Sequence, residues 1–169
     1  EDYIVVSAGN NVINGNGGDD YIHGWDGDDT ITVDSTAEYA IDVYNGGLGD
    51  DTIAITGTTT LSSTDADITG VENITIAGAS TVVVTGQTEA FTYTMADAIQ
   101  NLTTGSGADT INITAGTAAN TVNFLLTSGS DTITGFDTGE DKLDVDALGA
   151  VANTASNAAV TAGLVVANA

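Results

Sequence analysis

Glycine and acidic residues recur at fixed spacing in the first third of the chain, and carboxylates placed in this way could bind a metal ion. Segments 6–14, 15–23 and 24–32 align without gaps as units of nine residues, and 46–54 repeats the unit. Ca²⁺ favours six to eight oxygen ligands, and glycine lets the backbone bring carbonyls together. The fourth position of each unit is Gly and the sixth is Asn or Asp: Gly9, Gly18, Gly27 and Gly49, then Asn11, Asp20, Asp29 and Asp51.

Each unit ends in a short strand that would position these residues. Its eighth residue is Ile, and the alternation of side chains along a strand sends this large aliphatic group inward. Two such half-turns make one rung of a flattened parallel solenoid, and stacked rungs bury a ladder of Ile and Val side chains. The sequence therefore predicts an all-β fold, a parallel β-roll or β-solenoid with calcium ions between its turns.

The spacing of the sixth positions predicts which of them face each other. Two half-turns of nine residues make a rung of 18, so alternate units stack on one edge of the solenoid. Weaker units at 104–112, 115–123 and 126–134 place their sixth positions 11 residues apart, which gives rungs of 22. We expect ion positions between Asn11 and Asp29, between Asp29 and Asp51, and between Asp109 and Asp131.

The other edge of the solenoid is predicted to bind fewer ions. Asp20 and Asn120 lie on this edge. The next neighbour of Asp20 there should come from 33–45, a segment that lacks the glycine turn. Without that turn, fewer backbone carbonyls are available beside the carboxylate.

The nine-residue unit resembles the calcium-binding nonapeptide of the RTX (repeats-in-toxin) proteins, GGxGxDxUx. The resemblance is close in 6–32 and 46–54 and looser in 104–134. It implies several bound Ca²⁺ ions, and a bacterial protein that is secreted or held at the cell surface. The residues that it assigns to metal binding are Gly9, Asn11, Gly18, Asp20, Gly27, Asp29, Gly49, Asp51, Gly107, Asp109, Gly129 and Asp131, with Asp141 at the end of the array.

Two other interpretations of the acidic turns carry less weight. Gly and Asp are common in turns, so an ordinary β-sandwich would also contain Gly-Asp clusters. Three uninterrupted copies favour the repeat over that alternative. An EF-hand over 26–29 is excluded because the loop spacing and the terminal bidentate Glu are absent.

The middle of the chain lacks the motif but keeps short runs of Val, Ile and Thr. These runs, at 53–56, 68–77, 81–85 and 91–95, predict further solenoid rungs without metal. Residues 95–102 fit either a short helix or another rung. We therefore divide the calcium-bound solenoid, 1–146, into motif-rich parts at 2–54 and 104–144 and a motif-poor part at 55–103.

The last part of the chain resembles the end of an RTX array. Segment 135–146 is similar to the segment that closes such arrays in secreted bacterial proteases, with Phe136 and Leu143 covering the last rung. Asp137, Glu140 and Asp141 are candidates for a terminal ion site. The acid-free segment 147–169 resembles an export signal for type I secretion machinery, with a final strand pair as the alternative. A third possibility is that 162–167 docks onto a neighbouring subunit.

Charge and composition exclude several classes of function. The net charge is -23, and Lys142 is the one residue among Lys and Arg. Such a chain cannot neutralise a phosphate backbone, so nucleic acid is excluded as a partner. The chain has no run of 18 apolar residues to span a membrane, and it has no Cys. Its apolar content is that of a folded protein, so cations must screen the acids.

Catalysis has little support in the sequence. His23 is the only histidine, which leaves no second one for a zinc site, and no Ser–His arrangement is present. We expect no enzyme activity. Thr-x-Thr triplets at 30–32, 92–94 and 132–134 resemble ice-binding faces on calcium β-rolls, but three scattered copies predict no regular array.

These observations lead to an expected function. The chain is predicted to be an extracellular structural protein that folds on calcium and associates head to tail, as a surface-layer, filament or matrix subunit. The alternative is a C-terminal secretion or stabilisation module of a larger RTX enzyme or adhesin. A catalytic solenoid that acts on polysaccharide is a third and weaker candidate.

Overall fold

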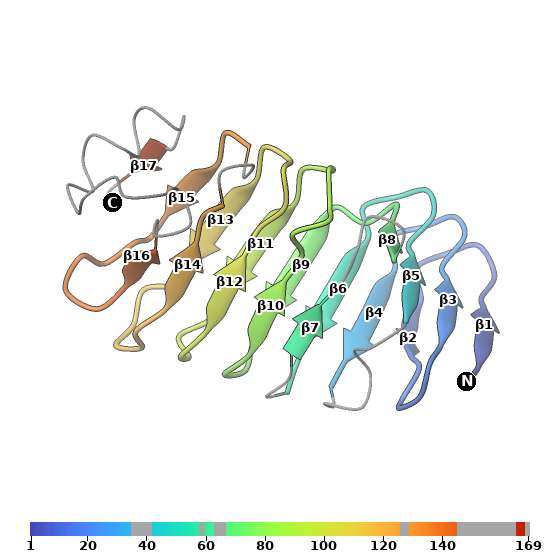
Figure 1. Ribbon diagram of the computed structural model, residues 1–169. Helices are drawn as coiled ribbons and strands as arrows, with labels where there is room; N and C mark the ends of the chain where they lie inside the picture. Colours follow the sequence, from blue (N-terminus) through green and yellow to red (C-terminus); the bar gives the residue numbers. More distant parts are fainter. Residues whose placement is uncertain (35–41, 58–59, 63–66, 126–128, 145–164, 168–169) are drawn as a thin grey trace.

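Parallel strands stacked in successive turns make up the structure, which is a computed structural model (Figure 1). It describes residues 1–34, 42–57, 60–62, 67–125, 129–144 and 165–167, and all the regular elements within these ranges are β-strands. No helix in the described part of the chain is long and apolar enough to cross a membrane. The predicted all-β solenoid is confirmed.

One wall of the solenoid is continuous along the whole stack. It is an 8-stranded sheet in which each inner strand pairs in parallel with a strand from the turn before and one from the turn after. Its strands are β2 (Val12–Asn14), β4 (Thr30–Val33), β6 (Thr52–Ile55), β9 (Asn73–Ile76), β11 (Thr92–Met95), β13 (Thr110–Ile113), β15 (Thr132–Thr134) and β17 (Val165–Ala167).

The opposite wall is divided into two sheets. The chain passes from one to the other between β6 and β9, where it contributes one strand to each sheet in turn, β7 and then β8. The first sheet contains β1 (Tyr3–Val5), β3 (Tyr21–His23), β5 (Val43–Asn45) and β8 (Ile68–Thr69). The second contains β7 (Thr60–Ser62), β10 (Thr81–Val83), β12 (Asn101–Thr103), β14 (Thr121–Asn123) and β16 (Lys142–Asp144).

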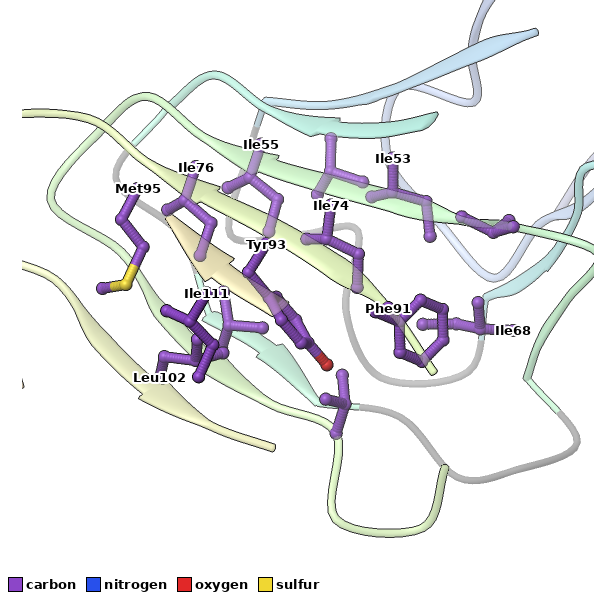
Figure 2. Close-up of a cluster of buried hydrophobic side chains, with 14 of the residues drawn as sticks. Ile53, Ile55, Ile68, Ile74, Ile76, Phe91, Tyr93, Met95, Leu102 and Ile111 are labelled. Atoms are coloured by element: carbon purple, nitrogen blue, oxygen red, sulfur yellow. The ribbon is translucent and has the colours of Figure 1, made fainter. Parts of the chain in front are cut away.

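The core is a ladder of aliphatic side chains that follows the continuous wall (Figure 2). Fully burying one Ile side chain contributes about 1.5–3 kcal/mol, so each rung adds a similar increment of stability. Tyr93 interrupts the row of Ile in β11 and is also fully buried. In register along the sheet, the ladder is Ile13, Ile31, Ile53, Ile74, Tyr93, Ile111 and Ile133.

The motif-poor segment 55–103 continues the solenoid, as predicted. Where the sequence fits either a helix or a rung at 95–102, the structure has β11 ending at Met95 and β12 beginning at Asn101. The run at 68–77 is not one strand: it divides into β8 and β9, which lie in different sheets. Gly70 makes the corner between them with φ +57°, a conformation that glycine adopts without steric cost.

The Thr-x-Thr triplets form no regular array of their own, as predicted. Triplets 30–32, 92–94 and 132–134 lie in β4, β11 and β15 of the continuous sheet, and other strands stand between them. Only the first position of the triplet is Thr or Asn on every rung between them, since Ala54 pairs with Thr32. The rungs differ in length, so equal positions in the sheet are unequally spaced in the sequence. One register column reads Thr30, Thr52, Asn73, Thr92, Thr110 and Thr132.

The C-terminal end of the described array is covered by apolar side chains. Phe136 and Leu143 are partly buried and pack against the core, as expected for a closing segment. Within the tail 147–169, Val165–Ala167 forms β17 beside β15. Most of the tail lies outside the described residues, so its export role, the complete final strand pair and the docking of 162–167 stay predictions.

Candidate metal centre

Backbone-to-carboxylate hydrogen bonds link the sixth positions along the continuous wall. The N–H of Asn11 donates to Asp29 Oδ1 (2.8 Å), and the N–H of Asp29 donates to Asp51 Oδ1 (2.7 Å). In the second half the N–H of Asp109 donates to Asp131 Oδ1 (2.9 Å). The three pairs predicted from spacing are therefore stacked neighbours on one edge.

The second oxygen of each of these carboxylates is buried and has no hydrogen-bond partner among the described residues. This holds for Oδ2 of Asp29, Asp51, Asp109 and Asp131, and each of these residues is 1% exposed. Burying a charged oxygen without a partner costs several kcal/mol, so in proteins such a group binds a cation or takes up a proton. The carboxylates thus fit the calcium that the sequence predicts.

The carbonyl oxygens of the turn before Asn11 point toward the Asn11 side chain. The Asn11 side-chain amide donates to the carbonyls of Ser7 (2.8 Å) and Gly9, the second and fourth residues of the unit. An Asp in the same place is an acceptor only and cannot make these bonds. In the units of Asp29 and Asp51, a cation between carboxylate and carbonyls would take the place of the amide N–H groups.

The first glycine of a unit leaves room for oxygen atoms of two rungs. A Cβ on Gly24 would lie 2.2 Å from Asp29 Oδ2 and 2.4 Å from the carbonyl oxygen of Gly46. A Cβ on Gly46 would lie 2.6 Å from Asp51 Oδ2. Any side chain would therefore fill the space that these oxygens share. The candidate ligands predicted above leave out these first glycines, although the motif begins with Gly-Gly.

Backbone carbonyls would have to supply much of the coordination. No group of three or more Asp, Glu or His side chains converges on one point in the part of the chain that the structure describes. A site between two rungs therefore has two carboxylates at most. Calcium accepts such a mixture of carboxylate and carbonyl oxygens in flexible geometry.

The fourth-position glycines have different backbone conformations in the two motif-rich parts. Their φ values are +115° at Gly9, +136° at Gly18, +126° at Gly27 and +148° at Gly49, which only glycine adopts readily. Gly107 holds the fourth position of 104–112 without a left-handed φ. Segment 104–134 therefore carries the carboxylates of the repeat on turns of a different backbone conformation.

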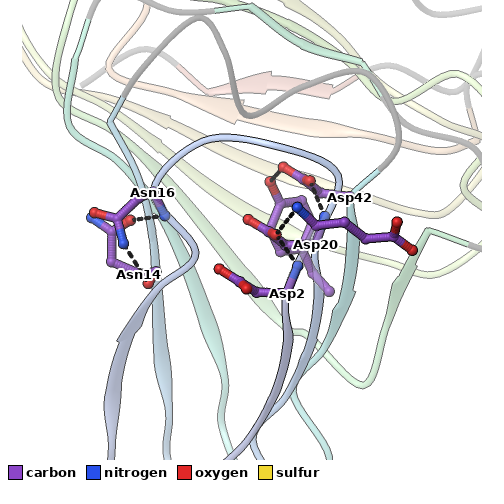
Figure 3. Close-up of polar contacts among 7 residues, drawn as sticks. Asp2, Asn14, Asn16, Asp20 and Asp42 are labelled. Carbon is purple, nitrogen blue, oxygen red and sulfur yellow. Dashed lines mark hydrogen bonds and ion pairs between the residues drawn. The ribbon is translucent and has the colours of Figure 1, made fainter.

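The second edge of the solenoid has its own row of acids (Figure 3). The N–H of Asp2 donates to Asp20 Oδ1, and the N–H of Asp20 donates to Asp42 Oδ1, both at 2.7 Å. The neighbour of Asp20 thus comes from 33–45, as predicted. The sequence analysis did not name Asp42, although Asp42-Val43-Tyr44 has the same spacing of carboxylate and inward side chain as Asp51-Thr52-Ile53.

Hydrogen bonds satisfy more of the carboxylate oxygens on this second edge. The hydroxyl of Tyr44 donates to Asp42 Oδ2 (2.9 Å), and neither Asp20 nor Asp42 has an oxygen that is both buried and unpartnered. This difference in hydrogen bonding between the two edges agrees with the prediction that the second edge binds fewer ions. Ion binding itself stays a prediction.

Asp141 occupies the end of the second edge. Its Oδ1 accepts the N–H of Asn120 (3.1 Å), and its Oδ2 accepts the N–H of Asp137 (2.9 Å). Asp137 Oδ1 in turn accepts the N–H of Gly139 (2.7 Å). Both oxygens of Asp141 thus have partners within the protein, and the terminal ion site there stays a prediction.

Burial shifts the protonation of several carboxyls in the rows. Desolvation raises the pKa of Asp42, Asp51 and Asp109 above the usual value. It raises the pKa of Asp131 from 3.8 to about 6, with a smaller contribution from the neighbouring charge of Asp109. These groups resist carrying a negative charge because burial removes their hydration.

Acid is therefore expected to replace calcium in part. The folded-state pKa of Asp131 is raised, so its protonated form stabilises the fold below about pH 4, and this contribution is lost as the pH rises through 6. We expect the calcium-free chain to gain β-sheet signal in circular dichroism when the pH falls from 7 to about 4. Asp131→Asn should weaken this pH dependence. A flat β-sheet signal across this range would contradict the prediction.

Comparison with protein families agrees with the geometry of the first rungs. The family model of the RTX calcium-binding nonapeptide repeat, in four copies, matches residues 1–31 and 39–54. The chain carries RTX repeats. A search of curated proteins and a search of solved structures each found no match.

The units that the RTX model matches are those whose fourth-position glycines have a left-handed φ. The match ends before 104–134. The protein is therefore a calcium-binding RTX β-roll in its first part, continued by rungs that the match does not cover. Metal binding by individual residues, in the first part as in 104–134, stays a prediction.

Proposed function

We propose that this protein is an extracellular structural subunit that folds when calcium binds and then assembles head to tail in a surface layer, filament or matrix. The row of buried, unpartnered carboxylate oxygens carries the proposal, because it makes the metal-free fold costly. RTX repeat proteins are typically secreted by bacteria, which supports an extracellular location. Export as an unfolded chain suits a protein that folds only where calcium is abundant.

The net charge adds to the dependence on metal. With a net charge of -23, the chain repels itself, and the compact state brings successive acidic turns close together. Ions that bind only the folded rungs stabilise them by mass action. On this proposal, the acids make the metal-free chain open and the calcium-loaded chain rigid.

On this proposal, assembly would use the strand edges of the first described rung. Strands β1 and β2 are the end strands of their sheets, so each leaves one row of backbone groups unpaired in the described structure. Tyr3 and Val12 are 76% and 81% exposed there. A further rung could continue both sheets at this end. Contact between this end and the opposite end of another copy would be heterologous and would form an open filament.

Assembly can be tested on the purified chain. We expect polymers in electron microscopy at millimolar calcium that disappear with a chelator. Val12→Asp should prevent polymerisation and leave calcium-induced folding intact, because it places a charge on the proposed contact. Ile99→Asp is the matched control: Ile99 is also an exposed aliphatic residue, 65% exposed, but lies between β11 and β12. Equal polymerisation of all three proteins, or a chain that stays monomeric at millimolar calcium, would contradict the assembly proposal.

A module of a larger RTX enzyme or adhesin is the second candidate. The apolar cover formed by Phe136 and Leu143 favours it, since solenoids end in such capping segments. In this case the repeats would stabilise the C-terminal part of the larger protein and pass through type I secretion machinery. A monomer that folds on calcium would support this candidate. We propose no enzymatic role for the repeats themselves.

A further inference from the structure

The row of carboxylates on the continuous wall extends one rung beyond the RTX match. The N–H of Asp51 donates to Glu72 Oε2 (2.7 Å), in the same way that the N–H of Asp29 donates to Asp51 Oδ1. Glu72 lies in the corner between β8 and β9, whereas the match ends at residue 54. Glu72-Asn73-Ile74 repeats the spacing of Asp51-Thr52-Ile53, with Glu in place of Asp.

Two further oxygens lie at this corner. A Cβ on Gly46 would be 2.0 Å from the carbonyl oxygen of Gly70 and 2.6 Å from Asp51 Oδ2, so both oxygens border the same small space. Gly24 has the equivalent arrangement one rung earlier, with the carbonyl of Gly46 and the carboxylate of Asp29. The oxygen-lined space of the RTX turn is thus repeated with Gly70, which belongs to no repeat.

The Asp51 carboxylate needs a partner in this space. Asp51 is 1% exposed, and its Oδ2 has no hydrogen-bond partner in the described part of the chain. A cation between the carboxylates of Asp51 and Glu72 would give this oxygen a partner.

We propose that Asp51, Glu72 and the carbonyl of Gly70 form a calcium site that ends the array. The proposal rests on calcium binding by the RTX repeats and adds a site outside them. Glu72 suits this position because its corner is short. Only residues 70–72 separate β8 from β9, whereas 46–51 separate β5 from β6, and the extra methylene of Glu lets its carboxylate reach Asp51.

The next rung explains why the array ends at Glu72. Phe91 holds the equivalent position before β11, and its N–H donates to Asp109 Oδ1 (2.8 Å). The Phe91 side chain is buried and apolar. The rung of β11 therefore supplies no carboxylate at the position next to Glu72 on the side away from Asp51.

Counting bound ions tests the site. Native mass spectrometry with calcium should show one ion fewer per chain for Glu72→Gln than for the unmodified protein. Gln keeps an oxygen that accepts the Asp51 N–H, so the variant should fold. Asp50→Asn is the matched control, because it removes one exposed charge next to Asp51 without changing a proposed ligand, and it should bind as many ions as the unmodified protein.

The outcomes distinguish this site from the repeats. Asp51→Asn should lose two ions, because Asp51 borders both the site shared with Asp29 and the site shared with Glu72. If Glu72→Gln and Asp50→Asn both bind the full number of ions with unchanged affinity, Glu72 is only a hydrogen-bond acceptor and the site is refuted while calcium binding by the repeats stands. An unmodified chain that binds no calcium would refute both.

Discussion

Removal of calcium is expected to convert the chain from β-sheet to coil, as measured by circular dichroism in a chelating buffer at neutral pH. The physical reason is the set of buried carboxylate oxygens without partners. A site that binds only the folded state stabilises it by roughly 3–4 kcal/mol when calcium is 100–1,000 times the dissociation constant. Since whole domains are stable by only about 5–15 kcal/mol, the loss of two or three such sites suffices to unfold the chain.

Magnesium provides the control for this experiment. Mg²⁺ has the same charge but gives up its water reluctantly and demands near-ideal octahedral geometry, so carbonyl-rich sites between turns suit it poorly. We expect millimolar magnesium to restore much less β-sheet signal than calcium. The same β-sheet signal with chelator as with calcium would show that the solenoid does not depend on metal. Equal recovery with both ions would point to charge screening.

Asp29→Ala is expected to weaken calcium binding far more than Asp20→Ala. Asp29 borders two predicted sites, one shared with Asn11 and one with Asp51, and its Oδ2 is buried without a partner. Asp20 lies on the other edge, and neither of its oxygens is both buried and unpartnered. Interactions with charged groups are worth about 1.5–3 kcal/mol, so the Asp29 variant should lose roughly 10- to 100-fold in affinity.

Calcium titration followed by circular dichroism or calorimetry measures this difference. The two substitutions are matched, because each removes an Asp at the sixth position of a repeat unit, with Gly15 or Gly24 at the start of that unit. Each Asp also accepts one backbone N–H from the rung before it, so the loss of that bond affects both variants equally. Equal shifts of the calcium midpoint would contradict the assignment of the two edges.

Much of this solenoid was predictable from local spacing. The nine-residue unit places Gly, Asp and Ile so that turn, ligand and core residue follow one another within a single half-turn. Rung lengths followed from these spacings, and they correctly predicted that Asn11, Asp29 and Asp51 are neighbours. The prediction that Asp20 meets a residue from 33–45 was confirmed for the same reason.

Other features were not predictable because they depend on contacts between rungs of unequal length. Glu72 lies in a segment without the motif, and only the register of β9 against β6 brings it to Asp51. The division of 68–77 at Gly70 escaped prediction because a glycine marks a turn but does not show which sheet the strand on each side joins. The continuous Thr and Asn column was missed because its members are unequally spaced in the chain.

By itself, the amino-acid sequence determined a parallel β-roll with acidic turns suited to calcium, because glycine, carboxylate and Ile recur with a period that a half-turn repeats. The tertiary structure alone decided where the opposite wall changes sheet and which carboxylate oxygens lack a partner. It also showed that the row of acids continues to Glu72. These properties arise between residues about twenty positions apart, where hydrogen bonding and burial depend on the register of neighbouring rungs.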